Sequence, residues 1–392
     1  MTASPNTANR PAAIAVVVGT RPEAIKMAPV IRELRAAPAR WRPSVVATAQ
    51  HRELLDQVFR LFDIRPDRDL DIMQAGQSLF DVTERTLRGL ERAFSALAPD
   101  MVLVHGDTTT TFIGALAAYY LKIPVGHVEA GLRTGRRYSP FPEEMNRHLT
   151  GVLTDLHFAP THKAAWNLRS EGVDGNDILV TGNTVIDALL TVAARPEAPP
   201  GLPALPDLTG RRLLLMTAHR RESFGAPLER AFAALAAIAA SHPDCLLVYP
   251  VHPNPNVKEP AARILGGLAN VVLCEPLDYA PFVHLMKRAH AIITDSGGVQ
   301  EEAPSLGVPV LVMREVTERP EAVEAGAVRL VGTDPERIRL ELGRLLDDPA
   351  AHAAMAGAVN PYGDGQAARR IVQRLAHRFH GENLPEPFAV EA

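Results

Sequence analysis

The chain has 392 residues, of which 46% are hydrophobic and 22% charged, and its formal net charge is -4 with a pI near 6.4. This length exceeds what one hydrophobic core usually supports, so two domains are expected. The small negative charge offers no basic surface, so we expect no nucleic-acid partner. Residues 1–12 are polar and no apolar run approaches the ~18 residues of a membrane span, so we expect neither a signal peptide nor a membrane partner. Cys245 and Cys274 are too few for a disulfide framework, which favours a cytoplasmic location.

Short apolar runs alternate with amphipathic stretches along the whole chain. In the first half, strands are expected at residues 14–18, 44–47, 101–105, 124–128 and 156–159. Helices are expected between them at residues 22–36, 52–61, 78–97 and 108–121. A second series of strands follows at residues 212–217, 245–251, 271–274, 291–294, 309–312 and 328–331. Strands that alternate with helices in this way form parallel, doubly wound sheets.

A proline-rich stretch without apolar periodicity, residues 194–208, is the expected linker. It separates an N-terminal Rossmann-like domain, residues 1–193, from a C-terminal Rossmann-like domain, residues 209–365. A terminal helix at about 366–380 can pack back on the first domain. The sequence therefore predicts an α/β protein with two doubly wound parallel-sheet domains that face each other across a cleft. The ends of their strands would bind ligands there.

The run Asp295-Ser-Gly-Gly-Val-Gln-Glu-Glu follows the expected strand at 291–294 and leads into a helical stretch. A strand that turns through Ser296-Gly297-Gly298 into a helix presents free backbone N–H groups and a positive dipole end, which together hold phosphate. Glu301 and Glu302, about one turn into the helix, suit the hydroxyls of a ribose. The run predicts a binding site for a nucleoside diphosphate, and an ordinary glycine-containing turn is the alternative.

The first expected strand ends in Gly19-Thr20-Arg21-Pro22-Glu23, and Lys26 follows one helical turn later. Arg21 and Lys26 are candidates to bind a diphosphate or a sugar, and a capped helix start with surface cations is the alternative. This turn is not Gly-x-Gly-x-x-Gly, and the chain has no Walker A motif. We therefore expect neither a nicotinamide cofactor nor a phosphoryl-transfer P-loop.

Acidic residues border three successive elements of the first half. Asp107 follows the strand at 101–105, Glu129 follows the strand at 124–128, and Glu143 opens a helix. Two of these residues have a common structural alternative. Asp107 could be a helix N-cap, and Glu143 could interact with the helix dipole in the first turn of its helix. If one rim collects all three carboxylates, they are expected to raise and separate their pKa values, as general acid and base catalysis requires.

The second half adds basic residues after its strands. His219, followed by Arg220, comes directly after the strand at 212–217, near where a diphosphate would leave, and a structural histidine is the alternative. His252 lies in a loop that prolines make rigid, and it is either a ligand contact or only part of that rigid loop. Arg319 repeats the Arg-Pro-Glu pattern and is a candidate phosphate ligand. The histidines lack His-x-His and His-Glu-x-x-His spacing, so no metal site is expected.

Together these segments resemble the non-hydrolysing UDP-N-acetylglucosamine 2-epimerases. The matching segments are residues 19–23, 105–110, 128–134, 142–147, 219–222, 251–255, 295–320 and 360–365. The resemblance implies the GT-B-like arrangement of two Rossmann-like domains that many glycosyltransferases share. It also implies reversible conversion of UDP-N-acetylglucosamine to UDP-N-acetylmannosamine, without a cofactor. UDP is eliminated to give 2-acetamidoglucal and then added back, and the product feeds cell-surface polysaccharide synthesis.

The resemblance also implies roles for particular residues. The positions that match catalytic residues are Asp107, Glu129, Glu143 and His219, with the choice of acid and base left open. The positions that match UDP-sugar contacts are Arg21, Lys26, Phe282, Ser296, Gly297, Gly298, Glu302 and Arg319. Some bacterial members bind a second UDP-N-acetylglucosamine as an activator, and the matching positions are Gln50, Glu53, Glu143, Arg220 and His252. Residues 74–77 lack an arginine of some regulated members, so the strength of activation stays open. We expect a homodimer.

Other functions share parts of this pattern. An epimerase for a UDP-diacetamido-uronic acid would carry the same motifs. A GT-B glycosyltransferase would share the Ser-Gly-Gly turn and the ribose-binding glutamate, but it would need an acceptor groove rather than three carboxylates. A catalytically inactive nucleotide-sugar sensor would not need all the acid and base candidates.

Overall fold

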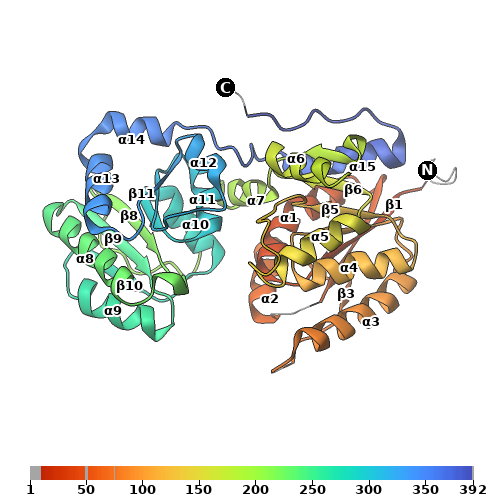
Figure 1. Cartoon of the computed structure of the whole chain (residues 1–392), viewed down its shortest axis with the longest axis horizontal. Helices are drawn as coiled ribbons and strands as arrows, with labels where there is room; N and C mark the ends of the chain where they lie inside the picture. The colour runs from red at the N-terminus through yellow and green to blue at the C-terminus, as the bar shows by residue number, and fades with distance from the viewer. Residues whose placement is uncertain (1–9, 49–51, 75, 391–392) are drawn as a thin grey trace. The chain divides into compact units, whose positions relative to one another are not determined.

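The computed structural model describes residues 10–48, 52–74 and 76–390. These described residues form two compact units, one within residues 10–188 together with 362–389 and one within residues 189–361 (Figure 1). The chain crosses from the first unit to the second within α7 (Thr184–Ala193). Each unit is a parallel-sheet α/β domain, which confirms the predicted fold class.

The sheet of the first unit has the strand order β3-β2-β1-β4-β5-β6-β7, and its neighbours pair in parallel. The strands are β1 (Ala12–Val18), β2 (Trp41–Ala47), β3 (Arg68–Asp69), β4 (Met101–His105), β5 (Val125–Val128), β6 (Leu156–Ala159) and β7 (Ile178–Val180). Every residue of β1 is buried, as expected for a central parallel strand covered on both faces. The order reverses between β1 and β4, and open parallel sheets bind ligands at the carboxyl ends of such a strand pair.

The helices of the first unit pack in two groups beside this sheet (Figure 1). One group comprises α3 (Leu79–Leu97), α4 (Thr109–Tyr120) and α5 (Glu143–Leu153). The other comprises α1 (Arg21–Arg35), α2 (Arg52–Leu61) and α15 (Ala367–His380), and α6 (His162–Ser170) follows β6. The terminal helix α15 packs on α1, and its Phe379 ring lies edge-on to Trp41 of β2, with the centroids 6.3 Å apart.

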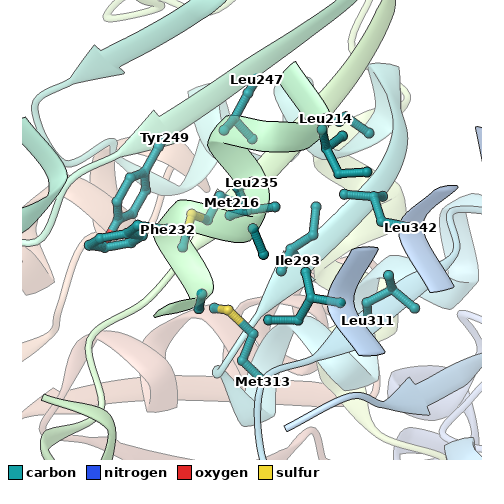
Figure 2. Packing of buried hydrophobic residues seen from close by; sticks show 14 of the residues in the cluster. Leu214, Met216, Phe232, Leu235, Leu247, Tyr249, Ile293, Leu311, Met313 and Leu342 are labelled. Carbon is teal, nitrogen blue, oxygen red and sulfur yellow. The ribbon is translucent and has the colours of Figure 1, made fainter. Parts of the chain in front are cut away.

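The second unit repeats the scheme with the strand order β10-β9-β8-β11-β12-β13. Its strands are β8 (Arg212–Thr217), β9 (Cys245–Pro250), β10 (Val271–Cys274), β11 (Ala289–Thr294), β12 (Val310–Val312) and β13 (Val328–Leu330). Its helices are α8 (Ala226–Ser241), α9 (Pro255–Leu265), α10 (Tyr279–Arg288), α11 (Gly297–Glu302), α12 (Pro320–Glu324), α13 (Pro335–Asp347) and α14 (Pro349–Ala356). Figure 2 shows Leu214 and Met216 of β8 packed with Phe232 and Leu235 of α8. In this sheet the order reverses between β8 and β11.

The structure differs from the predicted elements at the sheet edges and after the Ser-Gly-Gly turn. Strands β3 and β7 were not predicted, because they are too short to show an alternating pattern. The helix α11 ends at Glu302 and continues as a 3₁₀ turn over Ala303–Leu306. Pro304 lacks the N–H that an α-helix would need there, and Gly307 closes the turn with φ of 68°.

Candidate active site

The turn after β1 is built around a buried carboxylate. The Glu23 carboxylate accepts hydrogen bonds from the backbone N–H of Gly19 at 3.1 Å and of Thr20 at 2.6 Å. The Thr108 hydroxyl donates to the same carboxylate at 2.7 Å, so Glu23 ties this turn to the turn after β4. Glu23 is therefore structural. Arg21 has no hydrogen-bond or ionic partner among the described residues, so its guanidinium is available to an anion.

A cluster of opposite charges surrounds Glu129 at the end of β5. Lys26 donates to one carboxylate oxygen, and the Asn183 amide donates to the same oxygen at 3.0 Å. Arg147 of α5 donates to the Glu129 carbonyl oxygen at 2.9 Å. Glu129 adopts φ of 62°, which is uncommon outside glycine and costs roughly 1–3 kcal/mol, a kind of strain that concentrates at functional sites.

The protonation state of Glu129 corrects one expectation. Burial acts to raise the pKa of Glu129, but the neighbouring Lys26, His105 and Arg147 outweigh it and hold that pKa well below its ordinary value. The sequence predicted that clustered carboxylates would raise one another's pKa values. For Glu129 this prediction is wrong, because Lys26 donates to its carboxylate and Nη1 of Arg147 lies 4.0 Å from it. Glu129 is ionised at neutral pH.

Asp107 joins the same cluster through α5. Arg147 donates to the Asp107 carboxylate, and the Asn146 amide donates to the Asp107 carbonyl oxygen at 3.0 Å. The N-cap of α4 is Thr108, so Asp107 does not serve the capping role that was its structural alternative. Sequence reasoning missed Asn146 and Arg147 as site residues. A signal existed, because Arg147 lies four residues after Glu143 and therefore on the same face of α5.

Glu143 is the first residue of α5 and is half-buried. It makes no hydrogen bond or ion pair with the described part of the chain. Its neighbour Glu144 is the structural member of the pair, since it is buried and accepts from the backbone N–H groups of Thr134 and Gly135. Glu143 thus lies one helical turn from Arg147, and its carboxylate has no partner in the described part of the chain.

Three buried histidines on neighbouring strands give the first unit a pH dependence. Burial lowers the pKa of His105 and of His157 to about 4, and it lowers that of His127 well below 6.5. As pH falls below 6.5, these histidines become protonated in the unfolded chain but stay neutral in the folded one. Stability is therefore complete above about pH 6.5 and falls towards pH 4, by up to ~1.4 kcal/mol per pH unit for each histidine. Both tryptophans, Trp41 and Trp166, lie in the first unit, so denaturation followed by their fluorescence measures this loss.

The variant His157→Asn removes one of these protonation sites. We expect its stability to fall less steeply between pH 6.5 and pH 4 than that of the wild type, whatever its stability at pH 7. An unchanged slope would show that His157 does not resist protonation in the folded protein.

In the second unit, β8 and β11 end side by side and place an aspartate next to His219. The buried Asp295 carboxylate accepts from the backbone N–H groups of His219 at 2.7 Å and Arg220 at 2.8 Å. Its other oxygen lies 2.9 Å from Nδ1 of His219. These neighbours outweigh burial and keep the pKa of Asp295 below its ordinary value. An ionised Asp295 therefore orients the His219 ring, a role that sequence reasoning did not assign.

The turn Ser296-Gly297-Gly298 follows directly. A Cβ on Gly297 would lie 3.3 Å from the Arg319 guanidinium carbon, so glycine permits that cation to approach the turn. The Glu301 carboxylate accepts from Nε of Arg319 at 2.8 Å and is buried. Glu301 therefore holds Arg319 in place, a structural role that the sequence did not indicate.

Glu302 is the remaining ribose candidate. Its carboxylate accepts a hydrogen bond of 2.7 Å from the Tyr279 hydroxyl at the start of α10. Burial raises the pKa of Tyr279 well above 10, so this tyrosine stays a donor. Phe282 lies three residues further along α10, on the same face as Tyr279. The Tyr279–Glu302 hydrogen bond thus joins α10, which carries Phe282, to the end of α11.

The residues matched to an activator site are only partly described. Gln50 lies outside the described residues, and of Glu53 only the backbone, within α2, is described. The His252 ring stacks with that of His219, with centroids 6.1 Å apart. Arg220 lies 3.4 Å from Glu318. Arg220 and His252 therefore border His219 within the second unit.

The described residues contain neither a metal-binding cluster nor a membrane-spanning helix. Within residues 10–48, 52–74 and 76–390, no group of three or more His, Cys, Asp or Glu side chains is placed to hold a metal ion. The same residues contain no helix of the length and apolarity needed to cross a membrane.

Two Rossmann-type parallel sheets, one with a charged carboxylate cluster and the other with a Ser-Gly-Gly turn beside a histidine, define a GT-B-like nucleotide-sugar enzyme. The kitacinnamycin glycotransferase has the same fold, with a TM-score of 0.62 at 16% identity over 93% of this chain and 99% of that one.

The family model for UDP-N-acetylglucosamine 2-epimerase matches residues 32–376. The UDP-N-acetylglucosamine 2-epimerase of Escherichia coli K12 is 56% identical over 92% of this chain and 98% of that protein. The crystal structure of UDP-GlcNAc 2-epimerase from Neisseria meningitidis bound to UDP-GlcNAc is 48% identical and superposes with a TM-score of 0.82, over 93% of this chain and 99% of that one. The chain belongs to the UDP-N-acetylglucosamine 2-epimerase family, which confirms the resemblance inferred from its motifs, and it is an isomerase by class.

Proposed function

We propose that this protein interconverts UDP-N-acetylglucosamine and UDP-N-acetylmannosamine by inverting carbon 2 of the sugar. The observation that carries the proposal is the Asp107–Arg147–Glu129 cluster on a chain 56% identical to a named epimerase. The reaction breaks the bond from carbon 1 to UDP and removes the proton on carbon 2, which gives 2-acetamidoglucal. UDP then adds back to carbon 1 as a proton is delivered to the opposite face of carbon 2.

We assign the proton transfers to the first unit. Asp107 and Glu143 are the acid and base candidates with the most freedom, since one is partly exposed and the other has no partner among the described residues. Glu129 is ionised and surrounded by cations, so it cannot deliver a proton at neutral pH. Its charge suits it to stabilise positive charge that develops on the sugar ring as UDP leaves.

We assign UDP to the second unit. The Ser296-Gly297-Gly298 turn would donate backbone N–H groups to the diphosphate, with Arg319 beside it. The resemblance also matches Arg21 to a UDP-sugar contact. Glu302 would accept from the ribose hydroxyls, and Phe282 would contact the base. His219, oriented by Asp295, would assist the departure and return of the diphosphate.

Arg319→Ala should weaken UDP binding. The change removes a charged donor from the diphosphate site, which costs ~1.5–3 kcal/mol, or roughly ten- to hundredfold in affinity. Titration calorimetry with UDP measures the effect, and Arg339→Ala on the exposed face of α13 is the matched control. Equal UDP affinity in both variants would place the diphosphate elsewhere.

Incubation with UDP-N-acetylglucosamine and no acceptor tests the activity itself. Proton NMR should show conversion to the manno epimer until equilibrium is reached. A glycosyltransferase would leave the substrate unchanged or release free sugar. Conversion of a UDP-diacetamido-uronic acid, with no conversion of UDP-N-acetylglucosamine, would favour the related epimerase.

We also propose that a second UDP-N-acetylglucosamine activates the enzyme, in contact with Gln50, Glu53, Glu143, Arg220 and His252. Support comes from the family resemblance and from the position of Arg220 and His252 beside His219. The reverse reaction from pure UDP-N-acetylmannosamine should then lag until a trace of the other epimer is added. A reverse reaction without delay would rule the activator out.

A homodimer is the assembly we propose. Helices α4 and α5 pack together and expose Tyr119, Tyr120, Leu149 and Val152, the last with 83% of its surface accessible. Light scattering should give twice the chain mass, and Val152→Glu should lower the measured mass. A monomeric wild type would contradict the homodimer.

We also propose a cytoplasmic location, because the chain has only two cysteines. The family resemblance supports a role in supplying cell-surface polysaccharide synthesis.

A further inference from the structure

The segment after α15, residues 381–390, returns to the edge of the first unit's sheet. Gly381 ends α15 in the left-handed conformation, and Glu382 pairs with Arg40 at 2.7 Å. The backbone N–H of Phe388 donates to the carbonyl oxygen of Val180, the last residue of β7, at 2.8 Å. This C-terminal segment lies beyond residue 376, where the match to the family model ends.

Phe388 is the apolar anchor of the C-terminal segment. Its ring is 4% exposed and packs with Ala130, Ala159, Ala164, Ala165, Leu168 and Val180. The Arg370 guanidinium lies 5.5 Å above this ring and is held by Asp364 through hydrogen bonds of 2.7 and 2.6 Å. Leu384, in the same segment, is 57% exposed. The segment is therefore anchored in the core at Phe388 and attached at the surface by the Glu382–Arg40 ion pair.

The anchor lies against the turn that leads to Asn183. A Cβ on Gly182 would come 3.6 Å from the Phe388 ring and 3.2 Å from Cα of Gly363, so the turn is enclosed on both sides. The backbone N–H of Asn183 donates to the Tyr362 carbonyl oxygen at 2.6 Å.

The same anchor supports both ends of one hydrogen bond in the charged cluster. The Asn183 side-chain oxygen accepts from the Val185 backbone N–H at 3.0 Å, which directs the amide nitrogen to the Glu129 carboxylate. Ala130, directly after Glu129, belongs to the cluster that buries Phe388. A shift of Phe388 would therefore disturb the hydrogen bond from Asn183 to Glu129.

We propose that the C-terminal segment acts as a strap, with Phe388 as a positioning residue that holds Asn183 against the Glu129 carboxylate. The inference rests on the proposed function of Glu129. Misplacing a positioned group by about 1 Å can cost ~10²-fold in rate, so Phe388→Ala should lower kcat roughly ten- to hundredfold. UDP affinity should stay unchanged, because the groups assigned to UDP in the second unit are untouched.

The experiment compares kcat, UDP affinity and melting temperature for Phe388→Ala, Phe388→Leu and Leu384→Ala. Leucine keeps an apolar anchor and should restore most of the turnover, and Leu384→Ala is the matched control from the exposed part of the segment. Assays run well below the melting temperature of each variant. If Phe388→Ala melts earlier but keeps full kcat, Phe388 only stabilises the fold and the strap is refuted.

A double-mutant cycle of Phe388→Ala with Asn183→Ala tests whether Phe388 acts through Asn183. If Phe388 acts through Asn183, Phe388→Ala should cost little in the Asn183→Ala enzyme, and fully multiplicative losses would overturn the inference. Hydrogen exchange at residues 181–184 gives a readout independent of activity. It should be faster in Phe388→Ala, and unchanged exchange would refute the strap even if the wild type proved not to be an epimerase.

Discussion

Asp107→Asn should lower kcat by ~10²–10⁴-fold, the range typical of a lost general acid or base. The asparagine oxygen can still accept from Arg147, and the Asn146 contact uses the backbone of residue 107, so the local fold should survive. UDP affinity, measured by calorimetry, should change little. The isosteric change thus separates proton transfer from binding.

Two comparisons make the Asp107 result specific. Asp347→Asn, at an exposed aspartate of the second unit, controls for the chemical change alone and should keep normal turnover. Glu143→Gln should lose activity to a similar degree. If Asp107→Asn turns over normally, Asp107 serves only to hold Arg147, and the proton must pass through another group.

The pair of Asp295 and His219 should give the second large effect. We expect His219→Gln to lower kcat by ~10²–10⁴-fold. Asp295→Asn should lower it by roughly tenfold to a hundredfold, since a charged acceptor of hydrogen bonds contributes ~1.5–3 kcal/mol. Because Asp295 acts through the histidine, the double variant should be no slower than His219→Gln.

Tyr249→Phe is the matched control for this pair. The Tyr249 hydroxyl donates to the Ala218 carbonyl oxygen at 3.2 Å, so the change removes a hydrogen bond from the same turn but leaves Asp295 in place (Figure 2 shows Tyr249 within the core). We expect near-normal kcat for this variant. Losses that multiply in the Asp295–His219 double variant would show that Asp295 stabilises the turn independently of the histidine.

The sequence predicted the architecture well because its signals are local. An apolar run such as 101–104 followed by His105-Gly-Asp marks a buried parallel strand and its carboxyl end without any knowledge of contacts. Strand β3 was missed because Arg68 and Asp69 are polar, exposed residues at a sheet edge, and they carry no such signal.

The sequence predicted the site less completely, because ion pairs depend on side chains that are distant in the chain. Nothing local indicates that Lys26 would reach Glu129 or that Asp295 would lie 2.9 Å from His219. These contacts decide the protonation state of Glu129 and the orientation of the His219 ring. They arise only when β1, β4 and β5, or β8 and β11, align their ends.

The central claim is that carbon 2 loses and regains a proton while UDP leaves and returns. Epimerisation of UDP-N-acetylglucosamine in heavy water, followed by proton NMR, tests it most directly. We predict that every molecule of UDP-N-acetylmannosamine formed carries deuterium at carbon 2, with no NAD added. Product that keeps its original hydrogen at carbon 2 would contradict the elimination mechanism and the roles given to Asp107 and Glu143.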